Sequence, residues 1–114
     1  MRKPLIPLLC ALMLTSGCAS LSGPRLGSEL VGRMAQLAPE RGQASTLIFD
    51  RDGVVTSRFG QRTVSGRWWV RNRRLCFLWA GDFQECWPYA TPLVPGRTVP
   101  IMSDRGNRVR VTLL

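Results

Sequence analysis

Two cysteines lie at equal distances on either side of Gly81 in this chain. Gly81 and Asp82 form a turn pair between two apolar stretches, so a β-hairpin turning there sets Cys76 opposite Cys86. Directly opposed residues of an antiparallel pair that are not hydrogen-bonded to each other can have the Cα and Cβ separations that a disulfide needs. The pair therefore predicts one hairpin together with its register.

The chain after Gly42 continues in the same manner, as short apolar stretches separated by turn residues. Such spacing is typical of antiparallel strands, and Gly66 is a candidate bulge or bend within one of them. Strands are predicted over residues 46–49, 54–59, 63–70, 75–80, 83–89, 99–103 and 108–113. Because no long crossover interrupts them, we expect a mainly β fold, a small antiparallel meander curled as a barrel or sandwich.

Residues 28–38 show a different periodicity. Apolar residues recur there at helical spacing, at Leu30, Val31, Met34 and Leu37. Ser28 can cap a helix, Glu29 suits the positive end of its dipole, and Pro39 ends it. The pattern predicts one N-terminal helix packed on the β domain; a second contact with a membrane is the alternative.

The N-terminus has the order of an export signal. Arg2 and Lys3 precede an apolar run over residues 5–14, which small residues follow. About ten helical residues reach roughly 15 Å, half of a bilayer core, so a permanent membrane span is the weaker interpretation.

Ser16, Gly17 and Cys18 after this leucine-rich run resemble the lipobox of bacterial lipoproteins. The resemblance covers the first eighteen residues and implies a signal peptide over residues 1–17, with acylation of Cys18 as the new N-terminus. The small and polar residues that follow predict a tether over residues 18–27, which leads into a single domain over residues 28–114. Thr15 departs from the pattern, because that family usually has a large aliphatic residue there.

Ala19 resembles the residue after the cysteine in lipoproteins sorted to the outer membrane. The resemblance thus implies a lipid-anchored protein of the bacterial envelope, on the periplasmic face of the outer membrane. The alternative is a plain secretory signal that is cut near Ala19 or Ser20 and discards Cys18.

Export also bears on Cys76 and Cys86, because paired thiols are oxidised outside the cytoplasm. We therefore predict a disulfide, which in the chain-entropy picture stabilises the fold by roughly 2–3 kcal/mol. A redox-active dithiol would need the two-residue spacing of a CxxC motif or a His partner, and the chain has neither.

The absence of His excludes several functions. No Ser-His-Asp or Cys-His nucleophile, His-ligated zinc or haem with a proximal His can form. The cysteine spacings match no zinc knuckle, so no metal or cofactor is predicted. An enzyme would need paired carboxylates, and turn acids usually bond the backbone instead. We predict no catalytic residues; the acids considered are Asp50, Asp52, Asp82, Glu85 and Asp104.

Arginine is the only basic residue from Cys18 onward, and several arginines surround two adjacent tryptophans. Neighbouring strand residues point to opposite faces, so one of Trp68 and Trp69 belongs to the core. Arginines interleaved with aromatic rings suit an anionic partner, and export makes nucleic acid an unsuitable one. The candidate anion or ligand surface comprises Arg67, Trp68, Trp69, Arg71, Arg73 and Arg74. The envelope supplies lipid phosphates and peptidoglycan carboxylates as anions; the alternative is that these arginines are merely solvated.

Gly66-x-Trp68, then Leu75-Cys76-x-x-Trp79 and a second cysteine at Cys86, resemble a pattern in small proteobacterial envelope proteins of unknown function. That resemblance implies a small β-barrel in the envelope and no activity. The tryptophans and phenylalanines either fill its core or line a ligand pocket.

Together these features predict a noncatalytic cell-envelope lipoprotein, with a binding or structural β domain tethered to a bacterial membrane. The alternative is a periplasmic inhibitor of a protease or lysozyme, since such inhibitors are also small disulfide-bonded β-barrels. A lysozyme is the less suitable target, because lysozymes are typically cationic and would be repelled.

Overall fold

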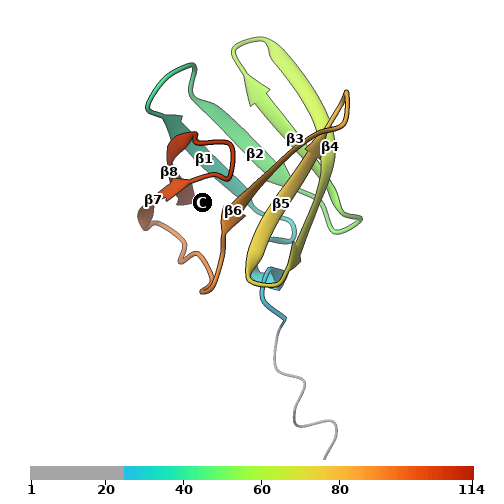
Figure 1. Cartoon of the computed structure of the whole chain (residues 1–114), viewed down its shortest axis with the longest axis vertical. Coiled ribbons are helices and arrows are strands. Elements are labelled where there is room, and N and C mark those ends of the chain that lie inside the picture. The colour runs from blue at the N-terminus through green and yellow to red at the C-terminus, as the bar shows by residue number, and fades with distance from the viewer. Residues whose placement is uncertain (1–24) are drawn as a thin grey trace, which may run out of the picture.

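The computed structural model describes residues 25–114, which form eight strands and one short 3-10 turn (Figure 1). The elements are η1 Ser28–Leu30, β1 Met34–Pro39, β2 Ser45–Phe49, β3 Val54–Phe59, β4 Arg62–Arg71, β5 Arg74–Trp79, β6 Phe83–Pro88, β7 Thr98–Met102 and β8 Arg108–Leu113. The predicted signal peptide, the acylation site at Cys18 and most of the predicted tether lie outside the described residues.

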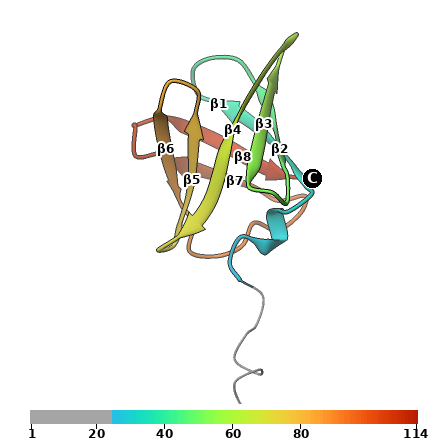
Figure 2. The ribbon, with the colours of Figure 1, turned by 90° about the vertical axis from the view of Figure 1, so that its right-hand side faces the viewer.

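The strands form one antiparallel sheet in the order β6-β5-β4-β3-β2-β1-β8-β7. The sheet curls until its two edges, β6 and β7, approach each other in a nearly closed barrel (Figure 2). The mainly β prediction is confirmed, and every predicted strand is present with each end within one residue of its expected place. Curling removes most of the open edge that a flat sheet would expose.

The predicted helix over residues 28–38 is wrong. Only Ser28–Leu30 form a 3-10 turn, and Met34–Pro39 form strand β1. Gly32 lies between them with φ 76°, a left-handed conformation that no helix can continue through. A helix of this length is marginal by itself, whereas β1 gains ladder hydrogen bonds from β2 on one side and β8 on the other.

Ser28 does not cap η1, because Gly27 occupies the N-cap position and has no side chain to make the capping hydrogen bond. The carboxylate of Glu29 instead accepts hydrogen bonds from the Gly27 amide, at 3.0 Å, and from the hydroxyl of Tyr89. Burial and the bond to Glu29 raise the pKa of Tyr89 above its ordinary range. In Figure 1 η1 lies at one end of the barrel, which we call the plugged end because the fully buried side chain of Leu30 packs into the core there.

Side chains alternate between the barrel interior and its outer face. The core of buried apolar residues includes Leu47, Phe49, Leu75, Phe77 and Val111, and β8 contributes three residues to it, at positions 109, 111 and 113. Each strand thus supplies every second residue to the interior, and Leu30 of η1 joins the same core.

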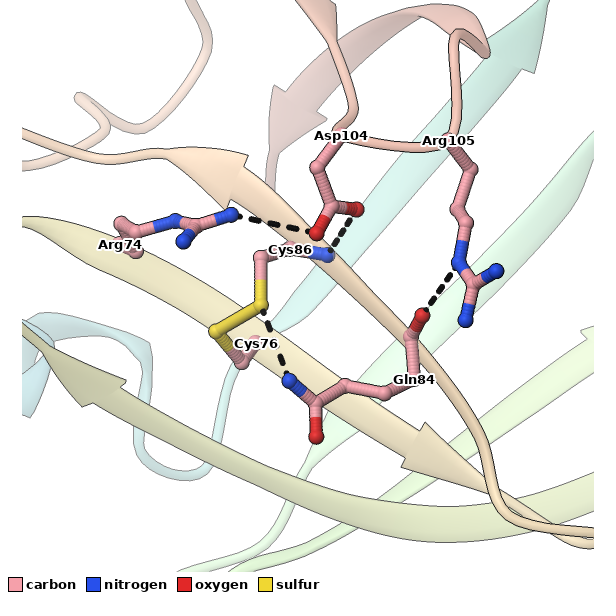
Figure 3. Close-up of a disulfide and its surroundings, with 6 residues drawn as sticks. All are labelled: Arg74, Cys76, Gln84, Cys86, Asp104 and Arg105. Carbon is pink, nitrogen blue, oxygen red and sulfur yellow. Dashed lines mark hydrogen bonds and ion pairs between the residues drawn. A yellow bond between two sulfur atoms is a disulfide. The ribbon is translucent and has the colours of Figure 1, made fainter.

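The disulfide prediction is confirmed, with Cys76 paired to Cys86 across the β5–β6 hairpin (Figure 3). The hairpin turns at Gly81 and Asp82, both with positive φ, as its register requires. Both cysteines are buried although they point to the outer face. On that face the side chain of Gln84 lies against the disulfide, with Nε2 3.7 Å from Sγ of Cys86 (Figure 3).

Candidate functional site

The predicted surface of arginines and tryptophans is divided between the two faces of β4. Trp68 points into the barrel, where its ring packs edge-on against Phe49 with centroids 5.1 Å apart. Its Nε1 donates a hydrogen bond to the carbonyl oxygen of Asp50 at 3.0 Å. Arg67 and Trp69 have the opposite orientation. One tryptophan thus belongs to the interior and one to the outer face, as strand alternation predicts.

The arginines of this surface differ in how they are used. Arg67, Arg71 and Arg73 are exposed. Arg74 forms the only ion pair among residues 25–114, with 3.1 Å between its Nη2 and Oδ2 of Asp104. Arg73 lies in the β4–β5 turn at φ 59°, a conformation that suits glycine better than arginine. Three free guanidinium groups therefore remain on the outside of β4 and its turn.

Asp104 joins the two edges of the sheet. Its Oδ1 accepts the backbone N–H of Cys86 at 2.9 Å, while its own N–H donates to the carbonyl oxygen of Cys86 at 2.9 Å (Figure 3). Asp104 belongs to the turn over residues 103–107, which we call the seam turn. Its two bonds to Cys86 take the place of the ladder hydrogen bonds that a neighbouring strand would make with β6 beside the disulfide. The ion pair with Arg74 holds the same carboxylate from its other oxygen.

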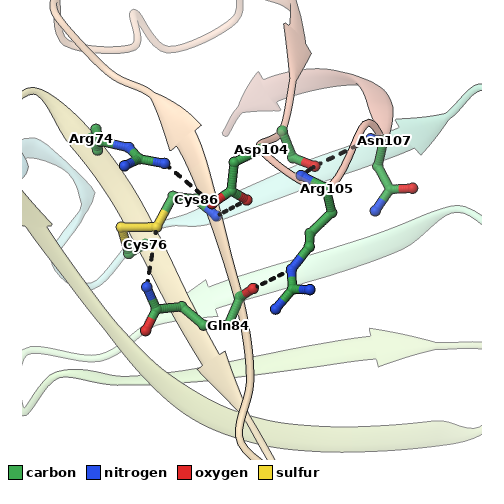
Figure 4. Close-up of polar contacts among 8 residues, drawn as sticks. Arg74, Cys76, Gln84, Cys86, Asp104, Arg105 and Asn107 are labelled. Carbon is green, nitrogen blue, oxygen red and sulfur yellow. Dashed lines mark hydrogen bonds and ion pairs between the residues drawn. A yellow bond between two sulfur atoms is a disulfide. The ribbon is translucent and has the colours of Figure 1, made fainter.

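Two further side chains of the seam turn reach β6, and Figure 4 shows the first of them, Arg105, at Gln84. Arg105 donates from Nε to the carbonyl oxygen of Gln84 at 2.8 Å, and its guanidinium lies 4.6 Å from the ring centroid of Phe83. Asn107 donates from Nδ2 to Oε2 of Glu85 at 2.6 Å. Together with Asp104, these contacts join the seam turn to β6 from Phe83 to Cys86.

Opposite the plugged end the barrel interior remains open as a cavity of about 390 Å³, which we call the cup. Its aromatic wall comes from β3, β5 and β6, and comprises Phe59, Phe77, Trp79 and Trp87. A second depression of about 500 Å³ adjoins it between β1, β6 and the seam turn, with Glu40, Arg41 and Arg108 among its lining residues. Leu37, Glu85 and Trp87 line both cavities, so the two form one mouth.

Gly66 shapes the aromatic wall. The pairing of Val55 with Gly66 and of Gly66 with Trp79 continues without an extra residue, so the predicted bulge is absent. A Cβ at position 66 would lie 2.9 Å from the Trp79 ring and 2.5 Å from the carbonyl oxygen of Leu78. Glycine thus lets the Trp79 indole lie against the backbone, where it stacks on Phe77 at 5.8 Å between centroids.

The cup also contains a few polar side chains, from Gln43, Ser45, Ser57 and Glu85. Ser57 is only 8% exposed, and its hydroxyl makes no hydrogen bond to any residue in the described part of the chain. An apolar cavity with a few polar groups is typical of a small-molecule site. Sequence reasoning considered Glu85 only as an acid and missed Ser57. Ser57 nevertheless lies two residues from both Val55 and Phe59, so it shares their inward face of β3.

The other acids do not gather into a second site. Asp50 accepts the backbone N–H of Asp52 at 3.4 Å within the β2–β3 turn, and Asp82 occupies the β5–β6 turn at φ 60°. Within residues 25–114 no group of three or more His, Cys, Asp or Glu side chains could hold a metal ion. No helix of that same range is long and apolar enough to cross a membrane.

Comparison of the chain with protein-family models, with curated proteins and with solved structures found no match.

Proposed function

We propose that this chain is a noncatalytic binding module of the bacterial envelope, and that the cup holds a small ligand with an apolar body. The observation that carries the proposal is a barrel plugged at one end and open, with an aromatic wall, at the other. Interiors of eight-stranded barrels are just wide enough to be filled by side chains or to hold one small ligand. Here side chains fill the plugged half, and the cup is the remaining volume.

A membrane tether agrees with this arrangement. The described chain begins at the plugged end (Figure 1). Arg25 is exposed, and the residues that line the cup belong to the opposite end of the barrel. A lipid on Cys18, as the lipobox resemblance implies, leaves the cup accessible. The exposed Arg67, Arg71 and Arg73 add a surface for anionic envelope components. Intact mass spectrometry of protein from membranes should show a start at Cys18 with added acyl mass; an unmodified start after Ala19 would contradict the tether.

The surroundings of two acids at the mouth, Glu85 and Glu40, support the proposal of binding without catalysis. Glu85 already accepts a hydrogen bond from Asn107, and Glu40 is exposed at the rim beside Arg41. The chain offers no His as a proton carrier between them. A bound compound should accordingly be recovered unchanged, as mass spectrometry after prolonged incubation can check.

Binding can be tested with N-phenyl-1-naphthylamine, a neutral apolar dye whose fluorescence rises in apolar surroundings. We expect saturable binding of one dye per chain. Val64 lines the cup and is 41% exposed, so Val64→Trp can narrow the cup without entering the core and should weaken binding. Trp69→Ala is the control, because it removes an aromatic ring from the outer face. Binding that survives V64W but is lost in W69A would place the dye outside the barrel and refute the proposal.

A further inference from the structure

Glu85 occupies an unusual position for a charged side chain. It lies on the inward face of β6 between Phe83 and Trp87, opposite the buried Phe77 of β5, at a place where the alternation calls for an apolar residue. It is also the only ionisable group that lines the cup within the described chain, in a protein where arginines far outnumber acids. A half-buried carboxylate destabilises a fold unless it is paired.

Glu85 is held in place by a hydrogen bond but has no ion-pair partner among residues 25–114. Asn107 donates to Oε2 at 2.6 Å, and the backbone N–H of Asn107 is fixed in turn by the hydroxyl of Ser103 at 3.2 Å. The structure shows no hydrogen bond to Oε1 and no ion pair with an arginine from residues 25–114. One oxygen is thus positioned by the seam turn, and the other remains free to accept a hydrogen bond.

The surroundings of Glu85 favour a positive or hydrogen-bond-donating group. Trp87 and Phe77 stand edge to face with centroids 4.8 Å apart, and Trp79 stacks on Phe77, so the wall offers several aromatic faces. Aromatic faces attract cations through their quadrupole. The unpartnered hydroxyl of Ser57 supplies a second polar contact in the same cavity.

The rim arginines do not reverse this preference. Arg41 and Arg108 line the adjoining depression and are exposed, so at physiological salt their field is screened within about 8 Å. A half-buried carboxylate inside the cup is screened much less, and it repels a carboxylate or phosphate that enters with its charged end first.

From these observations we propose that the cup selects an amphiphile whose polar end donates hydrogen bonds, an ammonium or a hydroxyl group, and that Glu85 is the acceptor. This inference rests on the proposed function, because it names the ligand class of the same cup. The apolar body lies against the aromatic wall, and the donor group reaches the free oxygen of Glu85.

Three probes of equal chain length test the inference: octylammonium, 1-octanol and octanoate, each below its micelle concentration, in competition with the bound dye. A hydrogen bond to a charged group is worth about 1.5–3 kcal/mol, which corresponds to roughly 10- to 100-fold in affinity. We expect octylammonium to displace the dye at least ~10-fold more effectively than octanoate, with octanol between them. The ratio of the affinities for octylammonium and 1-octanol distinguishes an ammonium ligand from an alcohol ligand.

Glu85→Gln is the decisive variant, because its amide oxygen can still accept the bond from Asn107 while the charge is lost. It should weaken octylammonium roughly 10-fold and leave octanol within a few-fold. Asp82→Asn is the matched control: it removes the same charge at the exposed β5–β6 turn, in a conformation that Asn tolerates.

The outcomes separate the two proposals. Equal binding of all three probes, or the tightest binding by octanoate, overturns the inference and leaves the dye-binding cup intact. Equal losses in E85Q and D82N would mean that only long-range charge is sensed, which also overturns it. Failure of the dye itself to bind would refute the proposed function and the inference together.

Discussion

Replacing Asp104 with Ala removes the side chain that joins the two edges of the sheet. The backbone N–H of Cys86 then loses its acceptor, and because Cys86 is only 2% exposed, water cannot easily replace it. A hydrogen bond to a charged acceptor contributes about 1.5–3 kcal/mol. The ion pair with Arg74 adds at most about 0.5 kcal/mol, since both side chains are more than a third exposed. We therefore expect D104A to lower the free energy of unfolding by about 2–3 kcal/mol.

Urea unfolding followed by tryptophan fluorescence measures this loss directly. Arg74→Ala is the matched variant, because it removes the ion pair and spares the bond to Cys86; it should lower the free energy of unfolding by no more than about 0.5 kcal/mol. Asp104→Asn retains an acceptor oxygen and should fall between the two. Equal losses in R74A and D104A would refute the reasoning, because the stabilisation would then belong to the exposed ion pair.

Further predictions concern the turns, the wall and the plugged end. Gly66→Ala should destabilise the fold by about 1–3 kcal/mol, measured by urea unfolding, because the added Cβ meets strand backbone. Arg73→Gly should raise stability by about 1 kcal/mol by relieving the positive φ; a loss would show that the arginine itself stabilises the turn. Cys76→Ala combined with Cys86→Ala should cost roughly 2–3 kcal/mol in the same assay. Because the pKa of Tyr89 is raised from 10.0, its contribution to stability should persist below that pH and decline above it. Near-ultraviolet titration of this single tyrosine checks the shift, and an unshifted titration would contradict the network with Glu29.

Most of the strands could be predicted because their signals are local. Turn residues divide the chain after Gly42, and the two cysteines define one register by symmetry about Gly81. Residues 28–38 could not be predicted in the same way. Leu30, Met34 and Leu37 satisfy a helical period, while β1 is stabilised by β2 and by the distant β8. Long-range pairing therefore overrides the local pattern.

The cup could not be predicted because its parts meet only when the barrel closes. Ser57 comes from β3, Glu85 from β6, and Asn107 from the seam turn that crosses the open edge of the sheet. No spacing in the sequence links these three positions. The arginines beside Trp69 were recognisable, by contrast, because they are neighbours along one strand and its turn. Local reasoning thus grouped residues that are neighbours in sequence, and it offered an aromatic pocket only as an alternative, without the polar residues of the cup.

The four tryptophans offer the most direct test of the central claim, that the cup is the binding site. Trp79 and Trp87 line the cup, Trp68 packs near Phe49 toward the plugged end, and Trp69 lies on the outer face. Titration of ¹⁵N-labelled protein with octylammonium should shift the indole signals of Trp79 and Trp87 and leave the other two unchanged. Shifts confined to Trp68 or Trp69 would contradict the account, because the ligand would then bind outside the cup.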